Sequence, residues 1–75
     1  MQVILMNDDP FGNNFRVTDS NANNSTIFNG YIDAHQEVTV QCHENDSGYG
    51  NIMTYQDNNN GIGRSFLRDG QRVSL

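Results

Sequence analysis

Hydrophobic and polar residues alternate in short runs along this chain, and clusters of polar residues separate the runs. The clearest run covers residues 37–43, where Val38, Val40 and Cys42 share one face of an extended strand and polar side chains share the other. No window repeats apolar residues at the i, i+3, i+4 and i+7 spacing of a helix over three turns. We therefore expect short strands and at most one helical turn.

The other predicted strands cover residues 3–6, 15–18, 26–32, 49–56, 64–68 and 71–75. Residues 3–6 are all apolar, which is typical of a strand buried on both faces. Within residues 26–32, Asn29-Gly30 indicates either a tight hairpin that pairs Phe28 with Tyr31 or a bulge in one continuous strand. The bulge is favoured because a hairpin would have very short arms.

Asp69-Gly70 lies between the last two predicted strands and is a strong hairpin signal. A two-residue loop there would place Phe66 opposite Val73, with both side chains in the core. Five to seven strands at this spacing favour an all-β domain, a small antiparallel barrel first and a sandwich second. The expected core residues are Val3, Leu5, Val17, Phe28, Ile32, Val38, Val40, Cys42, Phe66 and Val73.

Composition supports a single β domain over residues 1–75. Asn and Asp account for 19 residues, and both favour turns over long helices. A chain of this size buries only about 60% of its unfolded surface, so small domains often need disulfides, ions or partner subunits. Cys42 is the only cysteine, which excludes a disulfide within the chain. We therefore expect self-association.

The chain has a formal net charge of −5 and contains no Lys. This charge argues against a general nucleic-acid binder, which needs cations to replace phosphate counterions. Three of the four Arg residues, Arg64, Arg68 and Arg72, nevertheless lie close together near the C-terminus, which predicts a local basic region. The alternative interpretation is that these Arg side chains only balance the charge of nearby carboxylates.

The sequence lacks the residue patterns of common enzyme sites. There is no Gly-x-Ser-x-Gly and no glycine-rich phosphate loop. Cys42 is predicted to be buried without a cationic neighbour, which does not favour a reactive thiolate. His35, Cys42 and His43 lack the spacing of a tetrahedral metal shell. We expect a non-enzymatic protein without a cofactor.

Two polar loops have side-chain oxygens at alternating positions, which is a pattern that Ca²⁺ ligands use. Asp19 and Asn21 belong to the first loop, and Asp57 and Asn59 belong to the second. The first resembles the start of an EF-hand loop, but Gly30 stands where the motif needs Glu. These four residues are weak metal candidates, because ordinary turns in an Asn-rich chain produce the same pattern.

Tyr49, Tyr55, Arg64 and Arg68 are the candidate ligand-binding residues. Tyrosine rings beside glycine and polar residues can stack on a sugar or a base, although packing on their own sheet is the more common outcome. The segment of residues 65–73, Ser-Phe-Leu-Arg-Asp-Gly-Gln-Arg-Val, resembles the second signature of the Sm/LSm family. Arg68 matches the family's Arg, but Asp69 stands where the family has Gly. This resemblance implies a ring of subunits that binds single-stranded nucleic acid near Arg68.

Residues 1–6 are apolar except for Gln2, but the polar residues that follow leave them too short for a secretory core or a membrane span. We expect a soluble chain that does not enter a membrane. The sequence does not indicate the compartment in which the protein works.

The first functional hypothesis is a non-enzymatic binding or assembly module that works as a homo-oligomer, with residues 3–6 as a free strand edge. The alternatives are an Sm-like barrel that binds single-stranded RNA or DNA through Tyr55, Arg64 and Arg68, and a Ca²⁺-stabilised extracellular β domain.

Overall fold

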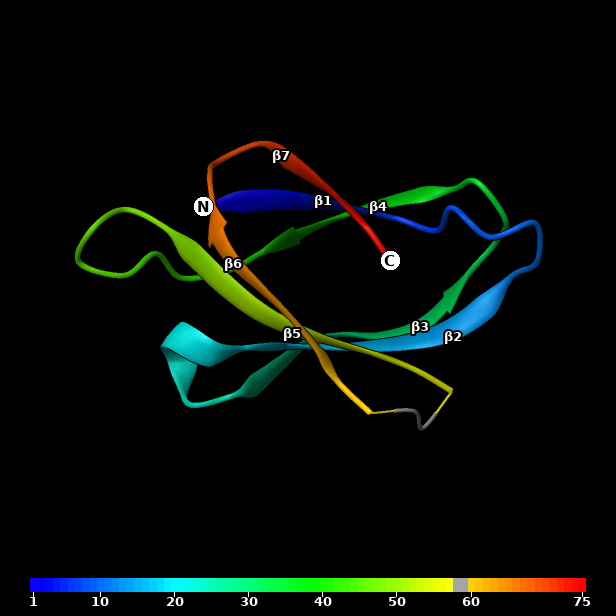
Figure 1. The fold of residues 1–75 in the computed structure, drawn as a ribbon, viewed down its shortest axis with the longest axis horizontal. Helices are drawn as coiled ribbons and strands as arrows, with labels where there is room; N and C mark the ends of the chain where they lie inside the picture. Colours follow the sequence, from blue (N-terminus) through cyan, green and yellow to red (C-terminus); the bar gives the residue numbers. More distant parts are fainter. Residues whose placement is uncertain (58–59) are drawn as a thin grey trace.

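The computed structural model describes residues 1–57 and 60–75, which form seven strands and one short 3-10 helix (Figure 1). The strands are β1 (Gln2–Met6), β2 (Asn13–Asp19), β3 (Ser25–Ile32), β4 (Glu37–Gln41), β5 (Gly50–Gln56), β6 (Ile62–Leu67) and β7 (Gln71–Ser74), and η1 is Ser20–Ala22. The predicted all-β class is confirmed, and the strand count lies within the predicted range.

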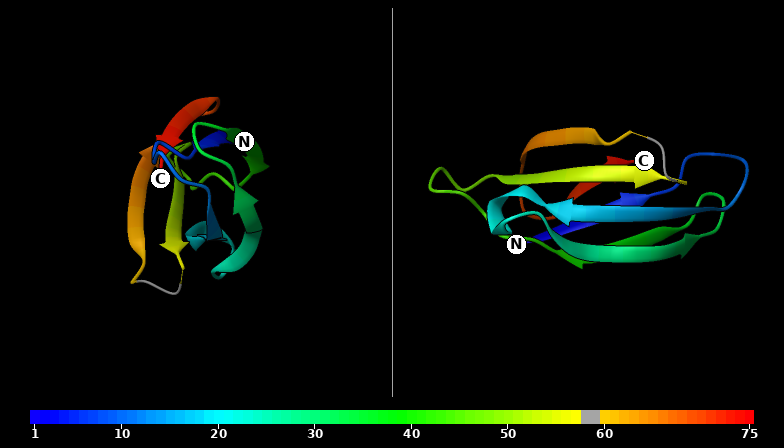
Figure 2. Two further views of the ribbon diagram at one scale, coloured as in Figure 1. Left: turned by 90° about the vertical axis from the view of Figure 1, so that its right-hand side faces the viewer. Right: turned by 90° about the horizontal axis from the view of Figure 1, so that it is seen from below.

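The strands form two sheets that face each other (Figures 1 and 2). One sheet has the order β4-β1-β7, and the other has the order β3-β2-β5-β6. The described strands do not close into one barrel, so their arrangement corresponds to the sandwich, the second predicted architecture. One pair departs from the expected antiparallel pattern, because β1 and β7 run parallel.

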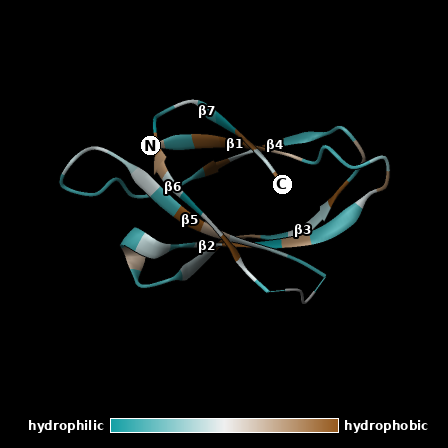
Figure 3. Ribbon diagram, viewed as in Figure 1, coloured by the Kyte–Doolittle hydropathy of each residue, from teal (hydrophilic) through white to brown (hydrophobic). Residues whose placement is uncertain are grey.

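The hydrophobic core fills the space between the sheets. Figure 3 shows strongly hydrophobic stretches on β1 and β5, which belong to opposite sheets. Of the predicted core residues, Phe28 and Val38 are partly buried and pack against the core. Buried residues among the predictions are Val3, Leu5, Val17, Ile32, Val40, Cys42 and Val73. Phe15, Ile52 and Leu67 are buried as well, although they were not among the predicted core residues.

Phe66 was predicted to lie in the core, and this prediction is wrong because its side chain is 72% exposed. Ile52 pairs with Arg64 while Gly50 pairs with Leu67, so β6 has one more residue than β5 between these pairs. Such a bulge reverses the alternation of side chains beyond it. Leu67 therefore enters the core at 4% exposure, and Phe66 points outward.

The predicted hairpin at Asp69-Gly70 is also wrong, because β6 and β7 belong to different sheets. The turn is instead a corner between the sheets, with Gly70 at φ +80°. Its backbone is held by the start of β1: the Gly70 amide donates to the Gln2 carbonyl at 2.8 Å, and the Gln2 amide donates to Asp69 Oδ1 at 2.7 Å. These contacts lead β7 to the free side of β1.

Two further predictions concern β1 and β3. Residues 3–6 are neither a free edge nor buried on both faces, because β1 lies between β4 and β7 and Ile4 and Met6 are only partly buried. Residues 26–32 belong to one continuous strand, as favoured. The bulge lies at Ile27 rather than Gly30, since Val17 pairs with Phe28 and Thr18 with Thr26.

Candidate functional site

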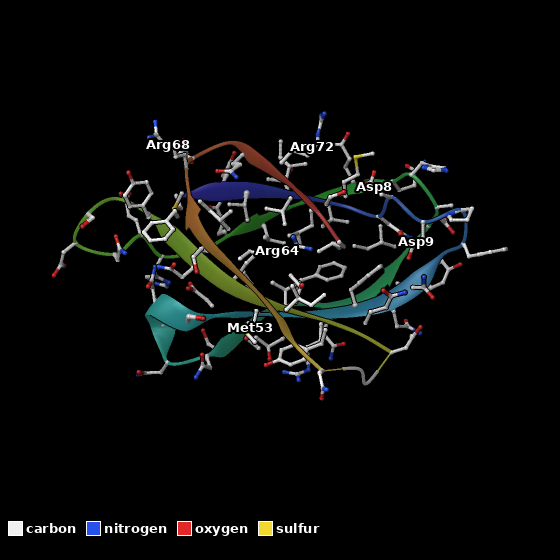
Figure 4. All side chains as sticks on the ribbon, viewed as in Figure 1. Asp8, Asp9, Met53, Arg64, Arg68 and Arg72 are labelled. Atoms are coloured by element: carbon white, nitrogen blue, oxygen red, sulfur yellow. The ribbon has the colours of Figure 1, made fainter. Side chains whose placement is uncertain are left out.

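Tyr49, Phe66 and Arg68 form an aromatic and cationic cluster at one end of the β5–β6 pair. The Tyr49 and Phe66 rings meet edge to face, with centroids 5.5 Å apart and an interplanar angle of 82°. The Arg68 guanidinium lies 5.9 Å from the Tyr49 ring centroid. Figure 4 shows Arg68 pointing away from the two sheets. The cluster offers an exposed ring face and a charged hydrogen-bond donor to a partner.

The bulge in β6 explains why Phe66 belongs to this cluster. Phe66 has φ +59°, a left-handed backbone conformation that is a genuine outlier for a bulky side chain. Leu67 next to it is buried against Gly50, which holds the bulge in place. Tyr49 and Arg68 were predicted binding residues, whereas Phe66 was predicted to lie in the core, because alternation alone does not reveal an extra residue in a strand.

A second cluster lies on the outer face of the four-stranded sheet. Arg16 Cζ stands 4.0 Å from the centroid of the Tyr55 ring, which is a close cation–π contact. A Cβ atom at Gly61 would lie 2.6 Å from Tyr55 Cε1, so glycine at this position leaves room for the ring. Arg16 was not among the predicted binding residues, because its position opposite Tyr55 depends on the pairing of β2 with β5.

An open groove of about 550 Å³ surrounds this second cluster. Its polar lining consists of Asn14, Arg16, Asn29, Tyr55, Asp57 and Asn60. The guanidinium of Arg16 already covers the Tyr55 ring, so this ring is not open for stacking on the side that faces Arg16. The groove therefore presents hydrogen-bonding groups rather than an aromatic platform.

The structure does not gather the four predicted ligand-binding residues at one place. Tyr49 and Arg68 lie together, while Tyr55 lies near the opposite end of β5 beside Arg16. Arg64 points into the space between the sheets (Figure 4), where its Nη2 donates to the Ser74 carbonyl at 2.8 Å. The three Arg residues of the predicted basic region therefore have different surroundings. Arg64 lies between the sheets, Arg68 lies beside Tyr49, and Arg72 forms an ion pair with Glu37 at 3.2 Å.

The metal candidates of the first loop form a network with the protein itself. Asp19 has no exposed surface, and its Oδ1 accepts from the Asn21 amide at 3.0 Å. Its Oδ2 accepts from the His43 amide at 2.7 Å and lies 3.0 Å from His43 Nδ1. The Asn21 side chain donates to the carbonyls of His43 and Tyr49. These contacts join η1 to the segment between β4 and β5.

The metal candidates of the second loop are only partly described. Asp57 follows the last residue of β5 and has φ +46°, and its amide donates to the Asn14 carbonyl at 3.2 Å. Asn59 lies outside the described residues. Within residues 1–57 and 60–75, no cluster of three or more His, Cys, Asp or Glu side chains is placed to hold a metal ion.

Cys42 lies in the core beside this network, at 5% exposure. Burial raises the pKa of its thiol, and the negative charge of Asp19 raises that pKa further. The neutral thiol is therefore the favoured form, and a nucleophilic thiolate is disfavoured. His43 follows Cys42 in sequence, but its exposed ring contacts Asp19.

The four-stranded sheet ends in two strands that each pair on one side only within the described chain. These edge strands are β3 and β6. β3 contains eight residues, none of which is charged. β6 contains one charged residue, Arg64, and its exposed apolar side chains are Ile62 and Phe66.

No family model, curated protein or solved structure matches the chain. Among the described residues, no helix has the length and apolar character that crossing a membrane requires.

Proposed function

We propose that this protein is a non-enzymatic assembly module that works as a homo-oligomer through the edges of its four-stranded sheet. The observation that carries the proposal is the edge strand β3, whose sequence Ser-Thr-Ile-Phe-Asn-Gly-Tyr-Ile has no charge and no proline. Natural edge strands usually avoid pairing with other chains by means of charged residues, proline, bulges or short length. Only the bulge at Ile27 is present in β3.

The part of β3 beyond this bulge is regular. Residues 28–32 pair in unbroken register with residues 13–17 of β2. Tyr31, near the end of this part, is 59% exposed, which leaves a large amphipathic side chain beside the free edge. A regular, uncharged edge of this kind can accept a further strand through backbone hydrogen bonds.

The surroundings of Cys42 and Asp19, whose side chains are of types that can serve in catalysis, support the non-enzymatic part of the proposal. The thiol of Cys42 is buried and its pKa is raised. Both carboxylate oxygens of Asp19 already accept hydrogen bonds from backbone amides. Both side chains therefore have structural roles in this arrangement.

Sedimentation velocity over a micromolar concentration range tests self-association. We expect the average mass to rise with protein concentration, as association between copies requires. Tyr31→Lys places a charge at the β3 edge and should give a monomer with an unchanged melting temperature. A wild-type protein that stays monomeric at all concentrations and salt levels would refute the proposal.

A second candidate function is the binding of single-stranded RNA or DNA. It is supported by the cluster of Tyr49, Phe66 and Arg68, because an exposed aromatic ring, that of Phe66, beside a cation suits stacked bases and phosphates. Fluorescence anisotropy with labelled oligo(U) at low salt tests it. Binding should weaken in Phe66→Ala and Arg68→Ala but much less in Arg72→Ala, a matched loss of charge at a residue that pairs with Glu37. Equal effects of all three substitutions would indicate nonspecific attraction.

A further inference from the structure

The two edges of the four-stranded sheet have free backbone groups at positions that can be assigned. The Asp57 amide donates to the Asn14 carbonyl, which places Asn14 in a hydrogen-bonded pair with β5. Antiparallel strands alternate between pairs that exchange hydrogen bonds and pairs that do not. We can follow this alternation from β2 and β5 to the edge strands through the residue pairs of the sheet. On β3, Asn29 and Tyr31 point their backbone groups away from the sheet, and on β6 Gly63 does the same.

The two edge strands have directions that allow a simple repeat. All neighbours in the order β3-β2-β5-β6 are antiparallel, so β3 and β6 run in opposite directions. Figure 2 shows these strands on opposite sides of the sheet. When a second copy is shifted across the sheet without being turned over, its β6 lies antiparallel beside β3 of the first copy. The alternation of strand directions then continues from one copy to the next.

Charge distinguishes this arrangement from a symmetric pairing of two β3 strands. Residues 25–36, which include β3, contain the acid Asp33 and no Arg, and Glu37 of β4 is already paired with Arg72 of the same chain. Residues 61–70, which include β6, contain Arg64, Arg68 and Asp69, and Arg68 is exposed. A symmetric β3–β3 contact would join two edges that each carry an acid and no Arg, whereas a β3–β6 contact joins such an edge to one with an exposed Arg.

We propose that the copies assemble head to tail, with the β3 edge of one copy paired to the β6 edge of the next. This inference rests on the proposed assembly function and adds the second contact surface. A contact between two different surfaces leaves one edge free on each terminal copy. The assembly therefore either grows with concentration or closes into a ring if the rotation between copies permits closure.

Two variants with matched substitutions test the inference. Tyr31→Lys adds a charge to the β3 edge, and Ile62→Lys adds one to β6 at a similarly exposed side chain, 56% against 59%. Each variant alone should be monomeric, because every contact in a head-to-tail assembly uses both edges. An equimolar mixture should form a 1:1 heterodimer, since Tyr31→Lys retains a normal β6 edge and Ile62→Lys retains a normal β3 edge. Thermal melting of each variant verifies that it is folded.

The other outcomes separate failure of this inference from failure of the proposed function. If Ile62→Lys alone still dimerises while Tyr31→Lys does not, pairing is symmetric through β3 and the head-to-tail arrangement is overturned. If wild type associates and both variants associate equally well, the contact lies elsewhere and the arrangement is again overturned. If wild type itself is monomeric throughout, the assembly function fails and the inference fails with it.

Discussion

The backbone amide of His43 donates a 2.7 Å hydrogen bond to Oδ2 of Asp19, whose carboxylate has no exposed surface. Oδ1 of the same carboxylate accepts from the Asn21 amide. A single buried side chain thus joins the end of β2, the helix η1 and the segment that follows β4. The sequence pattern that suggested a cation site is, in the folded chain, a set of hydrogen bonds between an acid and backbone amides.

Asp19→Ala should destabilise the protein by about 2–4 kcal/mol, because two backbone amides lose their acceptor in a partly buried region. Urea unfolding measures this change. His43→Ala is the matched control, since it removes a 75% exposed ring but retains the backbone amide, and it should cost only about 0–1 kcal/mol. Equal losses from the two substitutions would show that the ring contact, rather than the amides, is what matters.

Asn7→Ala should also destabilise the protein by about 2–4 kcal/mol. Asn7 is fully buried, and its Nδ2 donates to the carbonyls of Phe11 and Ile32 at 3.0 and 2.9 Å. Its Oδ1 accepts from the Asp9 amide, in the loop labelled by Asp8 and Asp9 in Figure 4. Asn45→Ala is the control, because Asn45 Oδ1 accepts two backbone hydrogen bonds in an exposed turn. Similar unfolding free energies for both variants would contradict the structural role of Asn7.

The buried thiol of Cys42 predicts that stability depends on pH in the alkaline range. Because the folded pKa is raised, the unfolded chain releases this proton first. The contribution to stability is therefore complete below the ordinary thiol pKa of about 8.5 and is lost as pH rises above it. Thermal melting across this range should show a steeper decline in wild type than in Cys42→Ala. Parallel pH profiles for the two proteins would refute the prediction.

Phe66 and Leu67 should respond in opposite ways to truncation. Leu67→Ala removes a core side chain and should cost about 2–4 kcal/mol, whereas Phe66→Ala should cost less than about 1 kcal/mol. Phe66→Asn should be at least as stable as Phe66→Ala, because Asn tolerates the positive φ of this position. Chemical unfolding of the three variants measures the differences. A larger loss at Phe66 than at Leu67 would show that the bulge is absent.

The strand phases were predictable from sequence wherever a strand is regular. Val38, Val40 and Cys42 share the inner side of the β4 segment as the alternation indicates, because one buried face imposes a period of two. Phe66 departs from this rule, since one extra residue in β6 reverses the alternation without leaving a mark in composition.

Long-range pairing accounts for most of what the sequence did not reveal. Asp69-Gly70 is a local hairpin signal, but it forms a corner between the sheets, where it contacts Gln2, far away in sequence. Tyr55 was identified as a candidate but its partner Arg16 was not, because their contact depends on the register of β2 against β5. Local propensity identifies turns and faces, but it does not specify which strands become neighbours.

The parallel pairing of β1 with β7 has a consequence for how the chain folds. Val3 lies opposite Gln71, so the central strand of one sheet acquires one of its two neighbours from the far end of the sequence. Contacts between such distant residues raise the contact order, which for all-β domains corresponds to folding times of roughly milliseconds to seconds. On a ribosome, this sheet stays incomplete until residues 71–74 have emerged, and until then one edge of the apolar strand β1 has unpaired backbone groups.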